Sequence, residues 1–264
     1  MERPRIRLYV EAPLTDGGTV ALDGKQAHYL FTVMRLGLGG AVALFNGRDG
    51  EWRAEVESAG KNKGLLRLVG QSVPQGTEPD LWLVFAPIKR AHIDFLAEKA
   101  TELGVSRLVP IITQYTDVAR VNTGRLRANA VEAAEQTERL SIPEVDEPQP
   151  LDALLGAWPA DRVLIALDES GGGRPILEAL LGLAQGDGLA AAPCAILVGP
   201  EGGFAAQEMQ KLRALPFVTT VGLGPRILRS DTAALAALTC WQAAGGDWHL
   251  PPSWSDRRTA GGKK

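Results

Sequence analysis

The sequence predicts an α/β protein in which a small β-rich domain precedes a larger domain built on a parallel sheet. Short apolar runs separated by Gly, Asn and Asp turns fill the first 70 residues, as in small β-rich domains. From residue 81 onward, continuous apolar runs alternate with stretches of helical periodicity, the pattern of buried parallel strands covered by helices. Between the two patterns, residues 71–80 are polar and contain two prolines, which is typical of a linker.

In the β-rich part, two turn signals in FNGRDGEW, Asn46-Gly47 and Asp49-Gly50, separate two strand-like runs. One helix is expected over 25–36, because apolar residues recur at helical spacing and Gly37 ends the stretch. The pattern predicts a small barrel or sandwich. The expected strands are RLYVEA, TVALDG, AVALF, EWRAEVES and GLLRLVG.

The second part continues as alternating strands and helices to about residue 245, and the polar stretch from Gly246 is expected to fray. The expected strands are 81–87, 107–112, 163–168, 195–199 and 217–223, and the expected helices are 92–104, 123–140, 175–184, 205–214 and 230–245.

The composition is that of a soluble globular protein, with 45% hydrophobic and 22% charged residues among 264. The N-terminus lacks the apolar segment of a signal peptide, and two cysteines far apart in apolar stretches fit a reducing compartment, so we expect a cytoplasmic protein. No apolar run is long enough to cross a membrane. The formal charge is +2 over residues 1–72, −8 over 73–250 and +3 over 251–264, so the two ends are better suited than the middle to meet a polyanion.

Two turns that follow apolar strands are the strongest candidates for a ligand site. Each of these turns leads from the carboxyl end of a strand into a helix, and open α/β sheets bind ligands at that edge. The two turns lie in residues 199–203 (GPEGG) and in the segment 221–238 (VGLGPRILRSDTAALAAL). The simpler interpretation of the first turn is a tight connection with Glu201 at the start of the next helix. For the second turn, the simpler interpretation is that Arg226 and Arg229 form ion pairs at the surface. In the second turn, one of Ser230, Asp231 and Thr232 is expected to cap the final helix.

Several kinds of site are disfavoured by the absence of their motifs. Neither a phosphate-binding loop ending in GK[ST] nor a GxGxxG fingerprint in a first βα unit is present. The three histidines and two cysteines lack metal-ligand spacing, so no metal is expected, and His92 is interpreted as a surface or capping residue. A GxSxG nucleophile turn is missing as well.

Arginines cluster in the first strand, around residue 120 and in the tail, where each cluster alone fits a solvated face. The helix expected over 123–140 carries Glu135 and Arg139 four residues apart, suited to a surface ion pair, and Gln136 on the same face as Arg139.

Along nearly its whole length the chain resembles the RsmE family of small-subunit ribosomal RNA methyltransferases, part of the SPOUT superfamily. The matching motifs stand in the order of the family. They are RIRLYVEAPL, His28 followed by VMRLGLGG, FNGRDGEW, EKATELGVSRLVPIIT, EAAEQTERLSIPEV, LVGPEGGF, GLGPRILRSDTAAL and a closing Gly246-Asp247.

The resemblance implies a PUA-like, RNA-binding β-barrel over 1–72, a linker over 73–80, a SPOUT methyltransferase domain with a C-terminal trefoil knot over 81–248 and a flexible tail over 249–264. It also implies a homodimer that uses S-adenosylmethionine (AdoMet) to methylate N3 of a uridine in 16S ribosomal RNA. The implied partner is this RNA, either free or within the small ribosomal subunit.

Residue roles are carried over motif by motif. Arg229 and Arg139 are expected to stabilise charge on the uridine ring, and no residue stands out as the general base. Arg5, Arg7, Arg35 and Arg120 are expected to contact RNA. The residues expected at the cofactor are Leu167 with Asp168, Val198, Gly199, Pro200, Glu201, Gly202, Gly203, Leu223, Gly224, Arg226, Ile227 and Leu228.

The chain departs from the family pattern at three places: Gln114-Tyr115-Thr116 replaces a segment with an arginine, Asp231 replaces a glutamate, and Glu138 replaces a small residue. Two other functions are less compatible with the sequence. An RNA-binding module without activity would not need both turns intact, and an α/β oxidoreductase would need the missing dinucleotide fingerprint.

Overall fold

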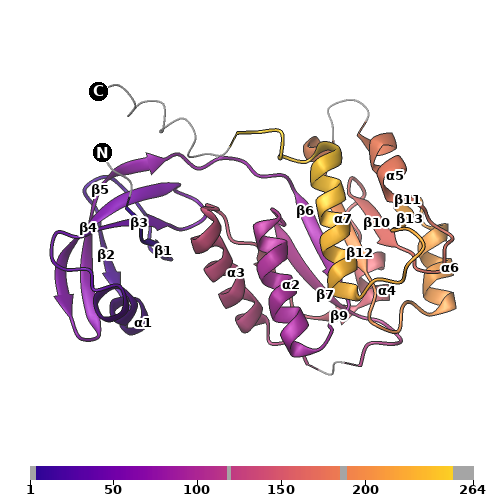
Figure 1. Ribbon diagram of the computed structural model, residues 1–264, viewed down its shortest axis with the longest axis horizontal. Helices are drawn as coiled ribbons and strands as arrows, with labels where there is room; N and C mark the ends of the chain where they lie inside the picture. Colours follow the sequence, from indigo (N-terminus) through magenta and orange to yellow (C-terminus); the bar gives the residue numbers. More distant parts are fainter. Residues whose placement is uncertain (1–3, 118–119, 185–188, 252–264) are drawn as a thin grey trace. The chain divides into compact units, whose positions relative to one another are not determined.

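The computed structural model describes residues 4–117, 120–184 and 189–251. It divides into two compact units (Figure 1). The first comprises Met1–Thr77 together with Ala134–Ile142, and the second comprises Glu78–Ala133 and Pro143–Lys264. No sequence pattern indicated that the short segment 134–142 would group with the N-terminal part.

The first unit is built on a five-stranded sheet in the order β1-β3-β4-β5-β2. β1 runs parallel to β3, and the remaining neighbours are antiparallel, including the long hairpin of β4 and β5. Side chains at alternating strand positions form one apolar core. The strands are β1 (Arg7–Tyr9), β2 (Thr19–Leu22), β3 (Ala41–Phe45), β4 (Glu51–Gly60) and β5 (Lys63–Val73).

The helix expected over 25–36 is shorter in the structure. Helix α1 (Gly24–His28) begins with a reciprocal cap, in which the Asp23 carboxylate accepts from the Gln26 N–H and the Gln26 side chain accepts from the Asp23 N–H. A single π-helical turn, Tyr29–Val33, follows it. Arg35 then adopts φ +55°, a left-handed conformation that a regular helix cannot contain.

The second unit contains the parallel sheet that the sequence predicts, in the order β11-β13-β10-β12-β6-β7-β8, with β9 beside β7. The sequence did not reveal the two-residue strands. The strands are β6 (Leu81–Phe85), β7 (Arg107–Ile112), β8 (Glu144–Val145), β9 (Gln149–Pro150), β10 (Val163–Leu167), β11 (Arg174–Pro175), β12 (Cys194–Val198) and β13 (Val218–Gly222).

Helices cover both faces of this sheet, because successive side chains of each strand point to opposite faces. In β6, Leu83 and Phe85 belong to one core with residues of α2, α5 and α7, whereas Val84 belongs to a second core with residues of α4 and α6. Figure 1 shows α7 beside α2, and the two helices are in contact. The helices are α2 (Arg90–Glu102), α3 (Thr123–Thr137), α4 (Leu151–Gly156), α5 (Ile176–Leu183), the short 3-10 helix Leu189–Ala191, α6 (Ala206–Ala214) and α7 (Ser230–Gly245).

Candidate functional site

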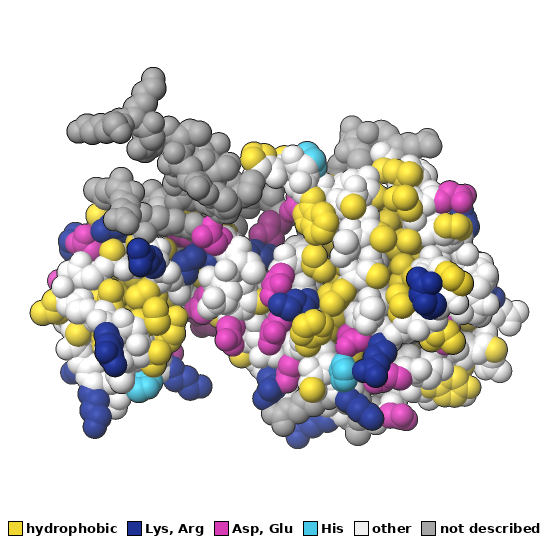
Figure 2. All heavy atoms as spheres, in the orientation of Figure 1, with side chains coloured by type: hydrophobic (Ala, Val, Ile, Leu, Met, Phe, Trp, Pro, Cys, Tyr) yellow, Lys and Arg dark blue, Asp and Glu magenta, His cyan; other side chains and the backbone are white. Residues whose placement is uncertain are grey.

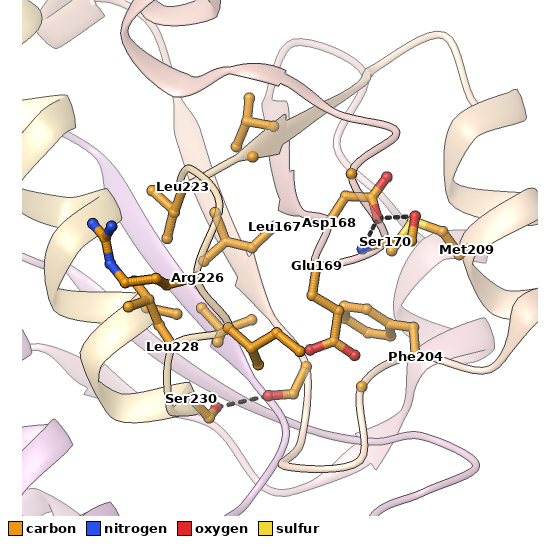
Figure 3. A pocket seen from close by; sticks show the side chains of 18 of the residues that line it. Leu167, Asp168, Glu169, Ser170, Phe204, Met209, Leu223, Arg226, Leu228 and Ser230 are labelled. Atoms are coloured by element: carbon orange, nitrogen blue, oxygen red, sulfur yellow. Dashed lines mark hydrogen bonds between the residues drawn. The ribbon is translucent and has the colours of Figure 1, made fainter.

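The candidate site lies at the carboxyl ends of β13, β10 and β12, which are neighbours in that order in the parallel sheet. Because parallel neighbours end at the same edge, the loops that follow them meet there. Together with α6 and the start of α7 they line a cleft of about 610 Å³ (Figure 3). A cleft of this size suits a small-molecule ligand.

The loop after β12 is shaped by two glycines. Gly203 has φ +70°, and its N–H closes a turn to the Pro200 carbonyl at 2.9 Å. A Cβ on Gly203 would lie 1.9 Å from Oε1 of Glu169, and one on Gly199 would lie 3.0 Å from the Phe204 ring. Glycine is therefore required at 203 by conformation and by space.

Glu201 lines the cleft and is exposed, and it does not start the next helix. Helix α6 begins at Ala206, and the acid of its first turn is Glu208, whose carboxylate accepts from the N–H groups of Ala205 and Gln114 at 2.9 Å each. The interpretation of Glu201 as a helix-start acid is therefore wrong, and its carboxylate is available to a ligand.

The loop after β13 is tied to the loop after β12 by Ser230, whose hydroxyl donates to the Gly199 carbonyl at 2.7 Å. The N-cap of α7 is Arg229, and no side chain caps that helix start, so the prediction of a cap by Ser230, Asp231 or Thr232 is wrong. Asp231 instead lies 2.7 Å from Nδ1 of His92 in the first turn of α2. Burial raises the pKa of Asp231, but hydrogen bonds from His92 and Thr232 outweigh it and hold the pKa below its ordinary value.

The loop after β10 contributes a group of residues around Asp168 that the sequence analysis named only in part. The buried Asp168 carboxylate accepts from the Ser170 N–H at 2.9 Å and hydroxyl at 2.6 Å, and from Arg213 of α6 at 2.6 Å. Burial raises the pKa of Asp168, but these donors outweigh it, so the net shift is downward. The carboxylate therefore stays ionised and fixes the course of the loop.

Most of the predicted cofactor residues converge on this cleft. Gly202 does not line it, because its α-carbon faces Tyr115: a Cβ there would lie 3.3 Å from the Tyr115 Cβ. Arg229 lines the cleft, whereas Arg139 belongs to the first unit. The predicted residues that line the cleft are Leu167, Asp168, Val198, Gly199, Pro200, Glu201, Gly203, Leu223, Gly224, Arg226, Ile227 and Leu228.

The sequence analysis missed further lining residues, namely Glu169, Ser170, Phe204, Met209 and Arg213. A signal for two of them was present, since Glu169 and Ser170 follow Asp168, which comes directly after the apolar run that ends at Leu167. Met209 and Arg213 lie inside α6, where helical periodicity does not reveal a ligand.

Among the four arginines expected at RNA, Arg5, Arg35 and Arg120 are exposed. Arg120 also lines a second, more polar cleft of about 430 Å³, next to the start of α3.

Arg7 is buried, and the prediction that it contacts RNA is corrected accordingly. Its guanidinium donates to the fully buried Glu51 carboxylate at 2.9 Å and to the carbonyls of Ala134 and Arg139 at 2.7 and 3.0 Å. It also lies 4.3 Å from the centre of the Phe45 ring. The arginine thus binds carbonyls at the end of α3, which stops at Thr137, and Glu138 leaves the helix with φ +65°.

Among the described residues, no group of three or more His, Cys, Asp or Glu side chains could hold a metal ion. Within the same residues, none of the helices is long and apolar enough to cross a membrane. The Cys194 thiol is buried in β12, and this burial raises its pKa to about 12, so it behaves as a small apolar group.

The cleft has the character that AdoMet requires. Its walls combine apolar side chains such as Leu167 and Leu228 with glycine backbone that a ligand can approach. AdoMet has no phosphate, and the loops lack the lysine of a phosphate-binding loop. The exposed Glu201 carboxylate in the lining is compatible with a cationic ligand.

Comparison with known proteins agrees with this site. A family profile described as an RNA methyltransferase domain matches residues 76–242, and one described as an RNA methyltransferase PUA domain matches residues 22–69. The ribosomal RNA small subunit methyltransferase E of Rickettsia conorii is 32% identical over 88% of this chain and 93% of its own length. Its counterpart from Bacillus subtilis is 28% identical over 90% and 95%.

Solved structures are similar over the same extent. The crystal structure of a ribosomal RNA small subunit methyltransferase E from Neisseria gonorrhoeae, bound to S-adenosyl methionine, superposes with a TM-score of 0.80 at 26% identity and covers 92% of this chain and 99% of its own. A putative methyltransferase from Legionella pneumophila, in complex with the same cofactor, gives a TM-score of 0.81 at 27% identity, with 93% and 100% covered. The matched profile, the relatives and the cleft together establish that this chain belongs to the RsmE family of small-subunit ribosomal RNA methyltransferases.

Proposed function

We propose that this protein transfers a methyl group from AdoMet to N3 of a uridine in 16S ribosomal RNA of the small subunit. The observation that carries the proposal is the convergence of three loops from adjacent parallel strands on one cleft free of phosphate-binding motifs. Bound AdoMet supplies an electrophilic methyl group on a sulfonium. The loop residues would hold and orient that cofactor, mainly through backbone groups at 198–203 and 223–228.

Uridine N3 must lose its proton, and charge then accumulates on the neighbouring ring oxygens. Arg229 lines the cleft at the start of α7, and we propose that its guanidinium stabilises that charge. We propose Arg139 as a second such group. Its Nε donates to the Ser141 hydroxyl at 3.1 Å, and its carbonyl is held by Arg7, so the turn that carries it is well fixed.

The proposal extends to RNA binding and assembly. The exposed Arg5 and Arg35 of the first unit, with Arg120, would contact the RNA backbone. Leu177 and Leu181 of α5 are 53% and 54% exposed, and Figure 2 shows hydrophobic side chains over α5 and α7. We infer that this face contributes to a homodimer. The trefoil knot at the C-terminal end of the sheet and a cytoplasmic location are part of the same proposal.

Methylation can be tested on small subunits that lack the modification, because a methyl group on N3 blocks Watson–Crick pairing and stops reverse transcriptase. The wild-type protein with AdoMet is expected to create one new stop. Arg229→Ala is expected to bind AdoMet normally in calorimetry but to methylate about 100-fold more slowly. A wild-type rate for Arg229→Ala would refute the role of this arginine, and a wild-type protein that binds AdoMet without creating a stop would favour an inactive RNA-binding module.

A further inference from the structure

Glu169 is an acidic residue of the cleft, and within the ranges that the structure describes its carboxylate takes no part in holding the surrounding loops together. It follows Asp168 in the loop after β10, lines the cleft and is exposed, and its Oε1 lies so close to Gly203 that a Cβ there would be 1.9 Å away. In Figure 3 the Glu169 side chain points into the space between the loops after β10, β12 and β13. The chain thus places an acid across two cofactor-binding loops, at a position where only glycine leaves room for it.

Two of the arginines that line the cleft, Arg213 and Arg226, are directed away from this acid. Arg213 of α6 donates to Asp168 and to the Ser170 hydroxyl, at 2.6 and 2.8 Å. The guanidinium of Arg226 points away from Glu169 in Figure 3. Among the described residues, neither a hydrogen bond nor an ion pair is recorded for the Glu169 carboxylate. A carboxylate in a ligand cleft without a cationic partner is suited to a cationic ligand.

The other acids of the cleft are less suited to this role. Asp168 is buried and already accepts three hydrogen bonds. Glu201 lies in the exposed turn of the loop after β12, which starts at the sheet edge and leads outward to α6. Glu169 alone approaches the backbone of the opposite loop.

We propose that Glu169 recognises the positively charged sulfonium of AdoMet and thereby distinguishes the cofactor from its neutral product, S-adenosylhomocysteine. This inference rests on the proposed function. The two molecules differ at the sulfur by one methyl group and one positive charge, so shape alone separates them weakly. A carboxylate near the sulfur would strengthen the binding of AdoMet, whose sulfur is positively charged. It would not strengthen the binding of S-adenosylhomocysteine, whose sulfur is neutral, and the product would therefore be released more readily. Glu169 is in this sense a specificity-determining residue.

The test is calorimetric and does not depend on turnover. AdoMet, S-adenosylhomocysteine and sinefungin, which carries a protonated amine in place of the methylsulfonium, are titrated into the wild-type protein and Glu169→Gln. Glu178→Gln serves as the matched control, because Glu178 is an exposed residue of α5 outside the cleft. Thermal midpoints of all three proteins check that the fold is intact.

Glu169→Gln is expected to bind AdoMet and sinefungin about tenfold more weakly and S-adenosylhomocysteine within about twofold of the wild type. The control variant should bind all three ligands like the wild type. Equal weakening of AdoMet and S-adenosylhomocysteine overturns the inference, since the contact would then be with a part that both share. Unchanged AdoMet binding overturns it as well. A wild-type protein that binds none of the three ligands instead overturns the proposed function, and the inference with it.

Discussion

At the scale of single residues, Arg7 illustrates how a charged side chain can be structural. The sequence places it in an arginine-rich first strand, which favours a solvated or RNA-facing role. In the structure, it is surrounded by Glu51, Phe45 and the carbonyls at the end of α3. These contacts hold residues 134–142 in the first unit.

Replacing Arg7 by Met is therefore expected to destabilise the protein strongly. The substitution keeps an unbranched side chain but removes the charged hydrogen bonds from Arg7 to the buried Glu51 carboxylate and to the carbonyls at the end of α3, at a cost of about 3–5 kcal/mol in the free energy of unfolding. Urea denaturation measures this loss. Arg5→Met, at an exposed position of the same segment, should change stability by less than about 0.5 kcal/mol. Equal stability of the two variants would contradict the structural role of Arg7.

A second prediction at this scale concerns Asp168 and pH. Its pKa in the folded protein lies below the ordinary value, so the unfolded chain takes up the proton first as pH falls. The stabilisation is therefore complete above about pH 4, the ordinary pKa, and disappears as pH falls through the folded-state pKa. We expect Asp168→Asn to be less stable than the wild type at pH 7 by about 1–2 kcal/mol, because hydrogen bonds to a charged group are lost.

The difference between wild type and Asp168→Asn should shrink as denaturation is repeated at lower pH. Asp16→Asn, at an exposed loop position, provides the matched comparison and should change the free energy of unfolding by less than about 0.5 kcal/mol at pH 7. If the difference in unfolding free energy between the wild type and Asp168→Asn grew as the pH fell, the predicted direction of the Asp168 pKa shift would be wrong.

At the scale of elements, the site depends on the way three strand ends are turned into loops. The parallel register of β13, β10 and β12 fixes where the loops begin, and Ser230 bonds one loop to the next. In the turn at 199–203, the last glycine has a left-handed conformation and faces Glu169.

Gly203→Ala is expected to weaken both the fold and AdoMet binding. A left-handed alanine costs about 1 kcal/mol, and the added Cβ would collide with the Glu169 carboxylate and displace the loop. Thermal denaturation and calorimetry with AdoMet measure the two effects.

Gly182→Ala is the matched control for this substitution. Gly182 lies in α5, where a Cβ meets no atom within 4 Å, so alanine should be neutral or stabilise the helix by up to about 1 kcal/mol. The combination of Gly203→Ala with Glu169→Ala should recover part of the lost stability; no recovery would mean that the collision does not matter.

At the scale of the whole molecule, function requires two tasks, RNA binding and methyl transfer. The second unit contains the complete cleft within its own sheet and helices. The exposed Arg5 and Arg35 belong to the first unit. This division argues that RNA affinity and cofactor affinity can be altered separately.

The assembly state is a prediction at this scale. Sedimentation equilibrium should give twice the chain mass of 28.1 kDa at micromolar concentration. Leu181→Glu places a charge on the exposed apolar face of α5 and should weaken the dimer at least tenfold, whereas Glu178→Gln on the same helix should not. A wild-type protein that sediments as a single chain would exclude the proposed dimer.

Local sequence patterns were sufficient for the α/β class, the parallel sheet and two of the three loops of the site. Strand and helix periodicity and the glycines at strand ends are local signals, which can be read from neighbouring residues in the sequence. For this reason the motifs GPEGG and GLGPRILR were sufficient to identify two of the loops that line the cleft. The same patterns overestimated the helices at 25–36 and 123–140, which end where Arg35 and Glu138 take left-handed conformations.

Only the tertiary structure decided the partners of individual side chains. Arg7 meets Ala134 across 127 positions of sequence, and Ser230 meets Gly199 across 31. Glu169 faces Gly203, and Arg213 of α6 reaches back to Asp168. The sequence determined which elements form and where a cleft opens. The packing of distant elements determined which charges are buried, which are paired and which remain free to meet a ligand, because solvation and partners depend on the whole surrounding structure.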